Sequence, residues 1–392
     1  PQQIQSKDIA KLAEVMNLSV AQLNSRLKRY HKKSFMYLAR QLPKAQADRI
    51  LELNILGISA RREYKRFYPA GEVTAQLVGF TDINDSGQEG MELAYDTWLT
   101  GEPGAKKVVQ DRAGRIINDI SLIKAARSGE DLRLSIDLRV QYAAYRALKK
   151  AVNKHKAKSG SVVVLDVQTG EVLAMVNQPS FNPNDRTNLR QDSIRNRAIT
   201  DLMEPGSTVK PFTMMAALES GKFSPESLIN TSPGYLKVDY KTFVDPVNYG
   251  ELSLAGVLAK SSQVGTTKIA LELDPEFTRE LFQRVGFGEV IGSGFPGETL
   301  GNLPAYRKWD QVTQATFAFG YGLSVSSLQL ARAYAVLAND GVRRDVSLVA
   351  LDSEPASLRV VDPETSRKVR HMLRAASGAS GTGKRAMIDG YS

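Results

Sequence analysis

Apolar residues near the start of the chain recur at helical spacing. The pattern predicts one helix from about residue 6, a break at Asn17–Ser19, and a second helix to Leu27 for which Ser19 is a suitable N-cap. A third helix is predicted over residues 44–56. Together these segments indicate a small helix-rich module, whose first two helices carry the apolar residues Ile9, Leu12, Val15, Met16, Val20, Leu23 and Leu27.

From residue 61 the pattern changes. Glycines divide residues 61–127 into short segments, which predicts strands, turns and one helix over Met91–Leu99. Leu132–Ile136 alternates like a strand, and a helix is predicted from Leu138 to about Lys154. Two apolar runs then flank a turn, and such runs are typical of a buried hairpin in a sheet covered on both faces.

Helical patterns dominate residues 205–340. A strand pair joined to a large helical region predicts an α+β or α/β fold around an antiparallel sheet. Because 392 residues are enough for two or three domains, we expect a first domain over residues 1–130 and a second over residues 131–392.

The composition excludes several kinds of catalytic and metal site. The chain has no cysteine, which excludes disulfides, thiolate zinc sites and a cysteine nucleophile. The chain has only three histidines, His31, His155 and His371, and they are scattered along it. It therefore offers few candidates for a Ser-His-Asp triad or a multi-histidine metal site. The net charge is 52 − 42 = +10, but the densest basic cluster, Lys28–Lys33, accompanies no nucleic-acid motif and is best read as a solvated helix end. Attraction to an anionic surface remains an alternative.

No apolar run approaches the length of a membrane helix, and no signal peptide opens the chain. The first residues resemble an interior cut, so we expect any anchor or export signal to lie outside this chain.

One segment combines a serine and a lysine at a helix start. In Glu204–Phe212 (EPGSTVKPF), Pro211 fits only the first turn of a helix, so Ser207 lies near its N-terminus. Lys210 follows three residues later and projects on roughly the same face. Burial and the positive end of the helix dipole both lower the pKa of such a lysine, so that it can take the proton of a serine. Free N–H groups at the same terminus can face a developing oxyanion.

A Ser-x-x-Lys tetrapeptide alone is weak evidence, because it occurs about twice by chance in a chain of this length. The alternative is a helix start with its lysine in solvent. The nine-residue context decides between them. It matches the active-site box of penicillin-binding proteins, and the chain resembles the class B members, specifically the division-specific peptidoglycan D,D-transpeptidases of Gram-negative bacteria (penicillin-binding protein 3 type). Further similar segments, in family order, are Arg66–Val73, Gly90–Asp96, Leu99–Gly104, Asp111–Arg115, Leu134–Asp137, Gly160–Val176, Pro179–Pro183, Arg195–Arg197, Phe319–Gly322 and Gln329–Tyr334.

The resemblance implies an N-terminal pedestal and a transpeptidase domain with a central antiparallel sheet covered by helices. It implies Ser207 as nucleophile, Lys210 as general base and Ser261 as proton relay, with no metal or organic cofactor. Gln263 stands where the family has Asn in its second, Ser-x-Asn, box. Ser262, Val209, Tyr321 and Gly322 are the expected substrate-binding residues.

The third family box, Lys-Thr/Ser-Gly, is not found. Ser380–Lys384 lacks a lysine before its Ser-Gly and has the wrong flanks. Gly378–Gly383 resembles the glycine-rich loop that precedes this box, and Gly390–Ser392 resembles its lead-in. We therefore expect the chain to stop short of the last strands and closing helix of the fold.

The implied protein cross-links peptidoglycan stem peptides on the periplasmic face of the inner membrane at the division site, and is acylated by β-lactams. Its implied partners are a division glycosyltransferase and other divisome proteins. A serine β-lactamase or β-lactam sensor is the alternative enzyme, although a pedestal of about 130 residues argues against β-lactamase. A non-catalytic division scaffold is the alternative of another class, favoured by Gln263 and the missing third box.

Overall fold

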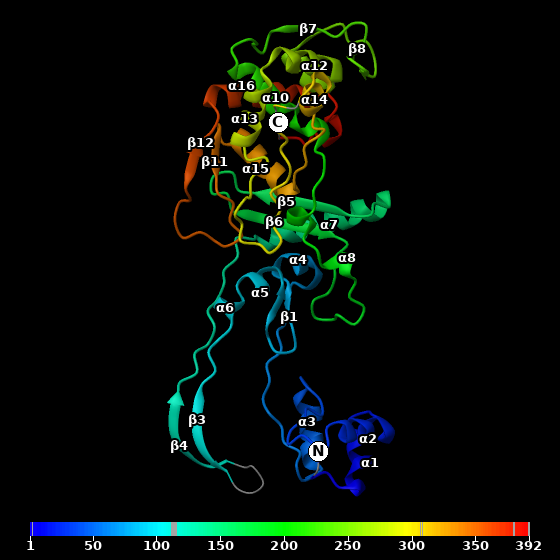
Figure 1. The fold of residues 1–392 in the computed structure, drawn as a ribbon, viewed down its shortest axis with the longest axis vertical. Helices are drawn as coiled ribbons and strands as arrows, with labels where there is room; N and C mark the ends of the chain where they lie inside the picture. Colours follow the sequence, from blue (N-terminus) through cyan, green and yellow to red (C-terminus); the bar gives the residue numbers. More distant parts are fainter. Residues whose placement is uncertain (2, 111–115, 306, 308, 379–380, 391–392) are drawn as a thin grey trace. The chain divides into compact units, whose positions relative to one another are not determined.

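The computed structural model describes residues 1, 3–110, 116–305, 307, 309–378 and 381–390 (Figure 1). These residues form two compact units. The first unit consists of Pro1–Phe67, Thr81–Ser86 and Asp96–Asp131, and the second of Tyr68–Phe80, Gly87–Tyr95 and Leu132–Ser392. No helix within the described ranges is both long enough and apolar enough to cross a membrane.

The helix-rich module of the first unit has the predicted pattern. Its helices are α1 (Ser6–Val15), α2 (Val20–Arg29) and α3 (Lys44–Glu52). Ser19 caps α2 in a full capping box, because its hydroxyl accepts from Gln22 N while the Gln22 side chain accepts from Ser19 N. The third helix ends earlier than residue 56, since Asn54 takes a left-handed conformation (φ 49°). Leu12, Ala13, Leu23, Leu27, Ile50 and Ile55 form the buried core of the module.

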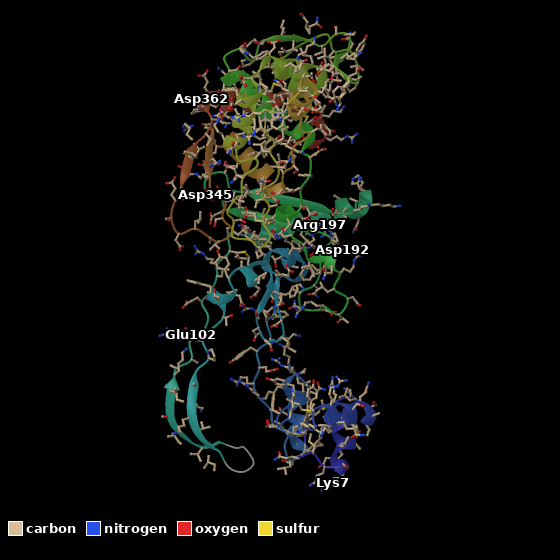
Figure 2. The ribbon with its side chains drawn as sticks, viewed as in Figure 1. Lys7, Glu102, Asp192, Arg197, Asp345 and Asp362 are labelled. Atoms are coloured by element: carbon tan, nitrogen blue, oxygen red, sulfur yellow. The ribbon has the colours of Figure 1, made fainter. Side chains whose placement is uncertain are left out.

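The first unit also contains a long antiparallel hairpin of β3 (Ala105–Gln110) and β4 (Ile116–Lys124). Near its open end Lys124 Nζ donates to Glu102 Oε2 at 2.8 Å. Figure 2 labels Glu102. The helix predicted over 91–99 is interrupted at Tyr95 and forms two short helices, α5 (Gly90–Ala94) and α6 (Asp96–Leu99). The short elements between residues 71 and 89 are η1 (Gly71–Val73), α4 (Ala75–Val78), β1 (Phe80–Thr81) and β2 (Gly87–Glu89). These elements and α5 belong to the second unit, except that Thr81 of β1 is counted in the first, as is α6.

In the second unit, α7 (Leu138–His155) packs along the antiparallel pair of β5 (Gly160–Leu165) and β6 (Val172–Gln178). This confirms the predicted helix and hairpin. The fully buried Gln141 of α7 accepts from Met175 N at 2.7 Å and donates to Met175 O at 2.9 Å. One side chain thereby satisfies both backbone polar groups of Met175.

Two expectations about the sheet need correction. Leu132–Ile136 is not a strand, because its pairing is limited to one isolated bridge between Leu134 and Val349 and two flanking backbone hydrogen bonds. β6 is mostly buried as predicted, whereas β5 is only half-buried and pairs, among the described residues, with β6 alone. The pair is therefore two-stranded within the described residues and not central in a larger sheet. Helices nevertheless cover both of its faces, as predicted. Val163 and Leu165 pack with residues of α9 (Arg197–Thr200) and α15 (Ser327–Ala338) on one face, and α7 lies on the other, where a Cβ at Gly160 would meet Leu148.

Helices make up most of the rest of the second unit, as the pattern predicts. Figure 1 shows α10, α12, α13, α14 and α16 gathered away from the β5–β6 pair. Phe212 of α10 lies at the centre of their core, with Phe287 and Tyr334 edge-on at centroid distances of 5.4 Å. The helices are α8 (Gln191–Ile194), α9 (Arg197–Thr200), η2 (Gly206–Val209), α10 (Lys210–Glu219), α11 (Leu254–Lys260), α12 (Gln263–Glu272), α13 (Pro275–Arg284), α14 (Gln311–Phe317), α15 (Ser327–Ala338), α16 (Pro363–Ser377) and η4 (Lys384–Ala386). The strands are β7 (Leu228–Asn230), β8 (Tyr235–Val238), β9 (Lys241–Val244), β10 (Glu251–Ser253), β11 (Val342–Arg344) and β12 (Ser357–Arg359).

Candidate active site

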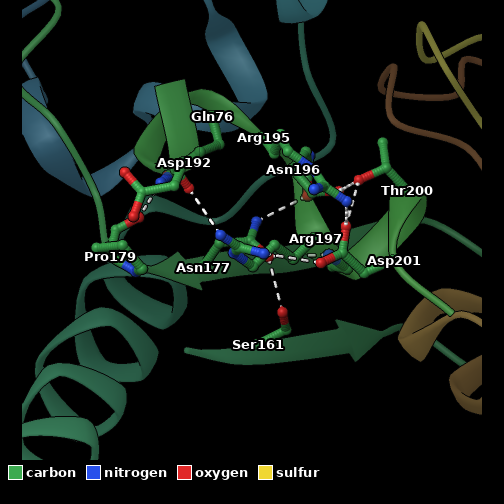
Figure 3. A network of polar contacts seen from close by, with 11 residues as sticks. Gln76, Ser161, Asn177, Pro179, Asp192, Arg195, Asn196, Arg197, Thr200 and Asp201 are labelled. Carbon is green, nitrogen blue, oxygen red and sulfur yellow. Dashed lines mark hydrogen bonds and ion pairs between the residues drawn. The ribbon is translucent and has the colours of Figure 1, made fainter. Parts of the chain in front are cut away.

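A buried polar network holds the segment that leads into the Ser207 box (Figure 3). Asn177 of β6 donates to Asn196 Oδ1 at 2.7 Å, and its own Oδ1 accepts from Ser161 Oγ and Ala198 N. Asp201 then accepts from the guanidinium groups of Arg195 and Arg197. Hydrogen bonds therefore join the strand pair, α9 and Asp201, which lies three residues before the box.

Ser207 and Lys210 lie at the start of a buried helix, as predicted. Ser207 belongs to the 3₁₀ turn η2, and Lys210 is the first residue of α10, with Pro211 in the first turn where it interrupts no helical hydrogen bond. Ser207 is exposed to solvent, whereas Lys210 is 1% exposed. The lysine is therefore not a solvated side chain, and the alternative interpretation of the tetrapeptide is wrong.

The amine of Lys210 is surrounded by oxygen atoms of the second box. Lys210 Nζ donates to Ser261 O at 2.6 Å, to Ser261 Oγ at 3.0 Å and to Ser262 O at 3.3 Å. Ser207 Oγ is not among its partners in this structure. Ser261 adopts a left-handed conformation (φ 53°) at the end of α11, which directs both its carbonyl and its hydroxyl at the amine.

Burial changes the acidity of this amine. Desolvation lowers the pKa of Lys210 from its ordinary 10.5 to about 8, because an ammonium ion is costly to hold away from water. The negative charge of Asp245 acts in the opposite direction and limits the decrease. Near neutral pH a minor but appreciable fraction of Lys210 is therefore uncharged and able to accept a proton.

Asp245 anchors the second box and was missed by the sequence analysis. This buried carboxylate follows β9 and accepts from Ser262 Oγ at 2.5 Å, Gln263 N at 2.6 Å and Val264 N at 3.2 Å. It therefore satisfies free N–H groups at the start of α12 from a separate segment of the chain. Ser262 completes the cap, since its hydroxyl also accepts from Gly265 N at 2.8 Å.

Hydrogen bonds donated by backbone N–H groups join the serine box to residues 320–322. Gly206 N donates to Gly320 O at 3.1 Å, and Gly322 N donates to Glu204 Oε1 at 2.9 Å. Gly320 has φ +93°, and a Cβ there would lie 2.1 Å from Gly206 O, so only glycine fits this approach. Behind the box, Tyr334 donates its hydroxyl to Thr208 O at 2.7 Å, and burial raises the pKa of Tyr334 to about 12.

The predicted residues occupy several environments. Tyr321 and Gly322 are exposed, and the backbone N–H of Gly322 contacts Glu204. Val209 and Ser262 are fully buried, and their side chains serve packing and capping here. The amide of Gln263 makes no hydrogen bond with any described residue, Lys210 included. The functional assignments of all these residues stay predictions.

Glu204 and Tyr334 lie in segments similar to the family, but the sequence predicts no role for either residue. Asp245 carries no local signal, because its partners are 17 to 19 positions away along the chain.

Parts of the predicted motifs lie outside the described residues: Asp111–Arg115, residues 379–380 of the glycine-rich loop, and residues 391–392 of the lead-in to the third box. The described remainder of the loop contacts α11, the helix that precedes the second box, since Thr382 N donates to Ala259 O at 3.1 Å.

Comparison with known proteins establishes the class. Residues 160–392 match the penicillin-binding protein transpeptidase domain, and residues 1–134 match the penicillin-binding protein dimerisation domain. The chain belongs to the penicillin-binding protein transpeptidase family. This confirms the predicted resemblance and the fold, a pedestal domain followed by a transpeptidase domain.

Particular relatives support the assignment. The chain is 43% identical over 97% of its length to the peptidoglycan D,D-transpeptidase FtsI of Escherichia coli K12, of which it covers 64%. It is 41% identical over 98% of its length to the probable peptidoglycan D,D-transpeptidase PbpC of Pseudomonas aeruginosa, of which it covers 68%. The chain thus spans about two thirds of the length of these curated relatives. The apo transpeptidase domain of Burkholderia pseudomallei penicillin-binding protein 3 superposes with a TM-score of 0.61 at 41% identity, covering 66% of this chain and 74% of that one.

Proposed function

We propose that this protein is a serine D,D-transpeptidase that cross-links peptidoglycan stem peptides at the division septum through a Ser207 acyl-enzyme. The observation that carries the proposal is the fully buried amine of Lys210, one helical turn after an exposed serine and hydrogen-bonded to the hydroxyl of Ser261. Relatives named peptidoglycan D,D-transpeptidases support the same reaction class.

In the acylation step, neutral Lys210 accepts the proton of Ser207 as Oγ attacks the penultimate D-Ala carbonyl of a stem peptide. Backbone N–H groups at the start of the helix stabilise the resulting oxyanion. When the C–N bond breaks, the terminal D-Ala nitrogen takes a proton from the Lys210 ammonium through the Ser261 hydroxyl. The products are free D-Ala and an ester on Ser207.

In the second step, an amine of a neighbouring stem peptide, expected to be meso-diaminopimelate, attacks the ester carbonyl and gives up a proton to Lys210 by way of Ser261. The C–O bond then breaks, Ser207 Oγ regains a proton, and the new amide is the cross-link. A β-lactam follows the first step only, because its cleaved ring nitrogen stays attached to the acyl group and obstructs the incoming amine.

We also propose different roles for the two parts of the chain. Residues 131–392 carry the chemistry, and residues 1–130 form a non-catalytic pedestal that binds partners. The partners proposed are peptidoglycan, a division glycosyltransferase and other divisome proteins, with the enzyme on the periplasmic face of the inner membrane and held there by an anchor. Matches to a transpeptidase and a dimerisation domain support this arrangement.

Labelling with a fluorescent penicillin tests the proposal. We expect the wild-type protein to form one stable adduct that mass spectrometry locates on Ser207, and Ser207→Ala to form none. Thr208→Ala is the matched control, because Thr208 is an exposed hydroxyl residue next to the nucleophile and should still be labelled. Rapid penicillin turnover without a lasting adduct would indicate a β-lactamase. Equally weak labelling of wild type and Ser207→Ala would indicate a scaffold.

A further inference from the structure

A stretch of the first unit is strongly and exclusively basic. Between Glu14 and Asp48 the chain has seven lysines and arginines and no acidic residue. Cations in the last turn of α2 stabilise that helix through its dipole. This effect accounts for Lys28 and Arg29, but not for Lys32 and Lys33, which lie beyond the end of the helix.

The basic residues border a groove with an apolar floor. The groove has a volume of about 720 Å³, and Met16, Leu18, Met36 and Leu38 line it. A second cavity of about 230 Å³ shares part of the same lining, including Phe35 and Tyr37. Residues 34–39 therefore have recesses along two sides.

The aromatic wall of the groove is open to solvent. The rings of Phe35 and Tyr37 meet edge-on at 4.9 Å and are 62% and 46% exposed. The backbone N–H groups of residues 34–40 donate to no described residue. Large apolar side chains and free backbone donors in one short segment are features that a bound chain can use.

The charges on this groove are mostly not neutralised. Arg40 is paired, through Nε to Glu63 Oε1 at 2.9 Å. Arg29 and Lys33 make no ion pair with any described carboxylate, and Lys33 Nζ lies 5.9 Å from the centre of the Tyr30 ring. The groove thus combines apolar recesses with uncompensated positive charge at its rim.

We propose that this groove binds an acidic segment of a partner protein that carries large apolar side chains. The apolar side chains would pack on Phe35, Tyr37 and Met36, and the carboxylates would face Arg29 and Lys33, as charge complementarity requires. A concave, two-sided recess fits a peptide chain better than the flat surface of a membrane. The inference does not depend on the reaction at Ser207, since it concerns only residues of the first unit.

Fluorescence polarisation with the whole protein tests the inference. The probes are two short fluorescein-labelled peptides of Glu, Asp, Leu and Trp, one with apolar residues at alternate positions and one with helical spacing. We expect at least one to bind, and its Gln/Asn counterpart to bind about tenfold more weakly. Because surface charges are screened by salt, binding should weaken as ionic strength rises.

Variants locate the binding. Arg29→Glu with Lys33→Glu, and separately Phe35→Ser, should each weaken probe binding about tenfold or more. The matched control is Lys150→Glu with Lys154→Glu on the exposed face of α7, which should leave binding unchanged. Unchanged penicillin labelling and melting temperature show that each variant is folded.

Two results would overturn the inference: neither probe binds, or the groove variants bind a probe as well as wild type does. If no probe binds, binding of wild type and variants to vesicles of phosphatidylglycerol is compared, and the outcome to look for is loss of vesicle binding in the groove variants. The last outcome would assign the surface to an anionic membrane instead.

Discussion

Lys210 and Lys33 have the same side chain but opposite environments. Lys210 is buried at the start of α10, a helix whose residues are almost all buried. Its amine donates to three oxygen atoms. Lys33 is exposed to solvent just beyond the end of α2, and its amine lies over the face of the Tyr30 ring. The two residues belong to different compact units.

The difference shows which surroundings allow a lysine to act as a general base. Desolvation lowers the pKa of Lys210 towards neutrality, and fixed partners hold the amine in one place. An exposed lysine keeps its charge and can contribute only attraction that salt weakens.

Removing the buried amine should have the largest effect. We expect Lys210→Met to reduce the rate of penicillin acylation by about 10³-fold or more, because general base catalysis is worth about 10²- to 10⁴-fold and the nucleophile is unreactive without it. Stopped-flow measurement of acylation checks this. Lys33→Met is the matched control and should acylate normally. Rapid acylation by Lys210→Met at neutral pH would remove Lys210 as the base.

The acylation rate should follow the ionisation of Lys210. With a pKa of about 8, the neutral fraction falls about tenfold for each pH unit below that value, so acylation should be about hundredfold slower at pH 6 than its plateau above pH 8. A pH–rate profile measured with a non-ionising β-lactam shows the midpoint. A rate independent of pH between 6 and 8 would contradict the assignment.

Stability should depend on pH in the same range. The folded pKa of Lys210, about 8, is lower than the ordinary 10.5, so between these values the unfolded chain binds more protons. The free energy of unfolding should therefore rise with pH from 8 to 10.5, by about 3 kcal/mol at most. Denaturant titrations of wild type and Lys210→Met separate this contribution, because the variant lacks the ionising group.

Replacing the carboxylate behind the second box tests its electrostatic influence. Asp245→Asn removes the charge that raises the pKa of Lys210, so the midpoint of the pH–rate profile should move to lower pH. It also weakens the bonds to Ser262 and α12, at a cost of about 1–3 kcal/mol in unfolding free energy. Asp274→Asn, which alters the exposed cap of α13, should leave the midpoint unchanged. An unmoved midpoint in Asp245→Asn would restrict Asp245 to a structural role.

Two capping boxes provide the smallest and most direct comparison of the units. Ser19 caps α2 at an exposed position, and Ser326 caps α15 at a position that is 1% exposed. We expect Ser19→Ala to cost about 1 kcal/mol and Ser326→Ala about 2 kcal/mol, because the buried change leaves backbone and side-chain groups without partners or water. Hydrogen exchange of α2 and α15 amides measures both. Equal costs would mean that burial adds nothing to the cap.

Local patterns predicted the parts of the structure that depend on local spacing. The break at Asn17–Ser19 and the limits of α7 follow from helical periodicity and capping. The positions of Ser207 and Lys210 follow from three-residue spacing and the helix-start preference of Pro211. Resemblance to the family led to Ser261, whose hydroxyl contacts Lys210, and its role as proton relay stays a prediction.

Contacts between distant segments could not be predicted in this way. Asp245 reaches the second box only because the chain after β9 folds back on the start of α12. Leu132–Ile136 alternates like a strand, but only Leu134 finds a bridging partner, on a loop more than two hundred residues later. Residue alternation indicates what a strand needs and not whether a partner strand is present.

The contact between Gly206 and Gly320 has a consequence for inherited variation. At this contact the loop that carries Ser207 is held by main-chain atoms. Substitution of a neighbouring side chain therefore does not remove the contact. Selection by an antibiotic can therefore alter an exposed neighbour such as Tyr321, and with it the fit of the drug, while the nucleophile keeps its position. Resistant lineages should accumulate substitutions around the opening of the site and retain these two glycines.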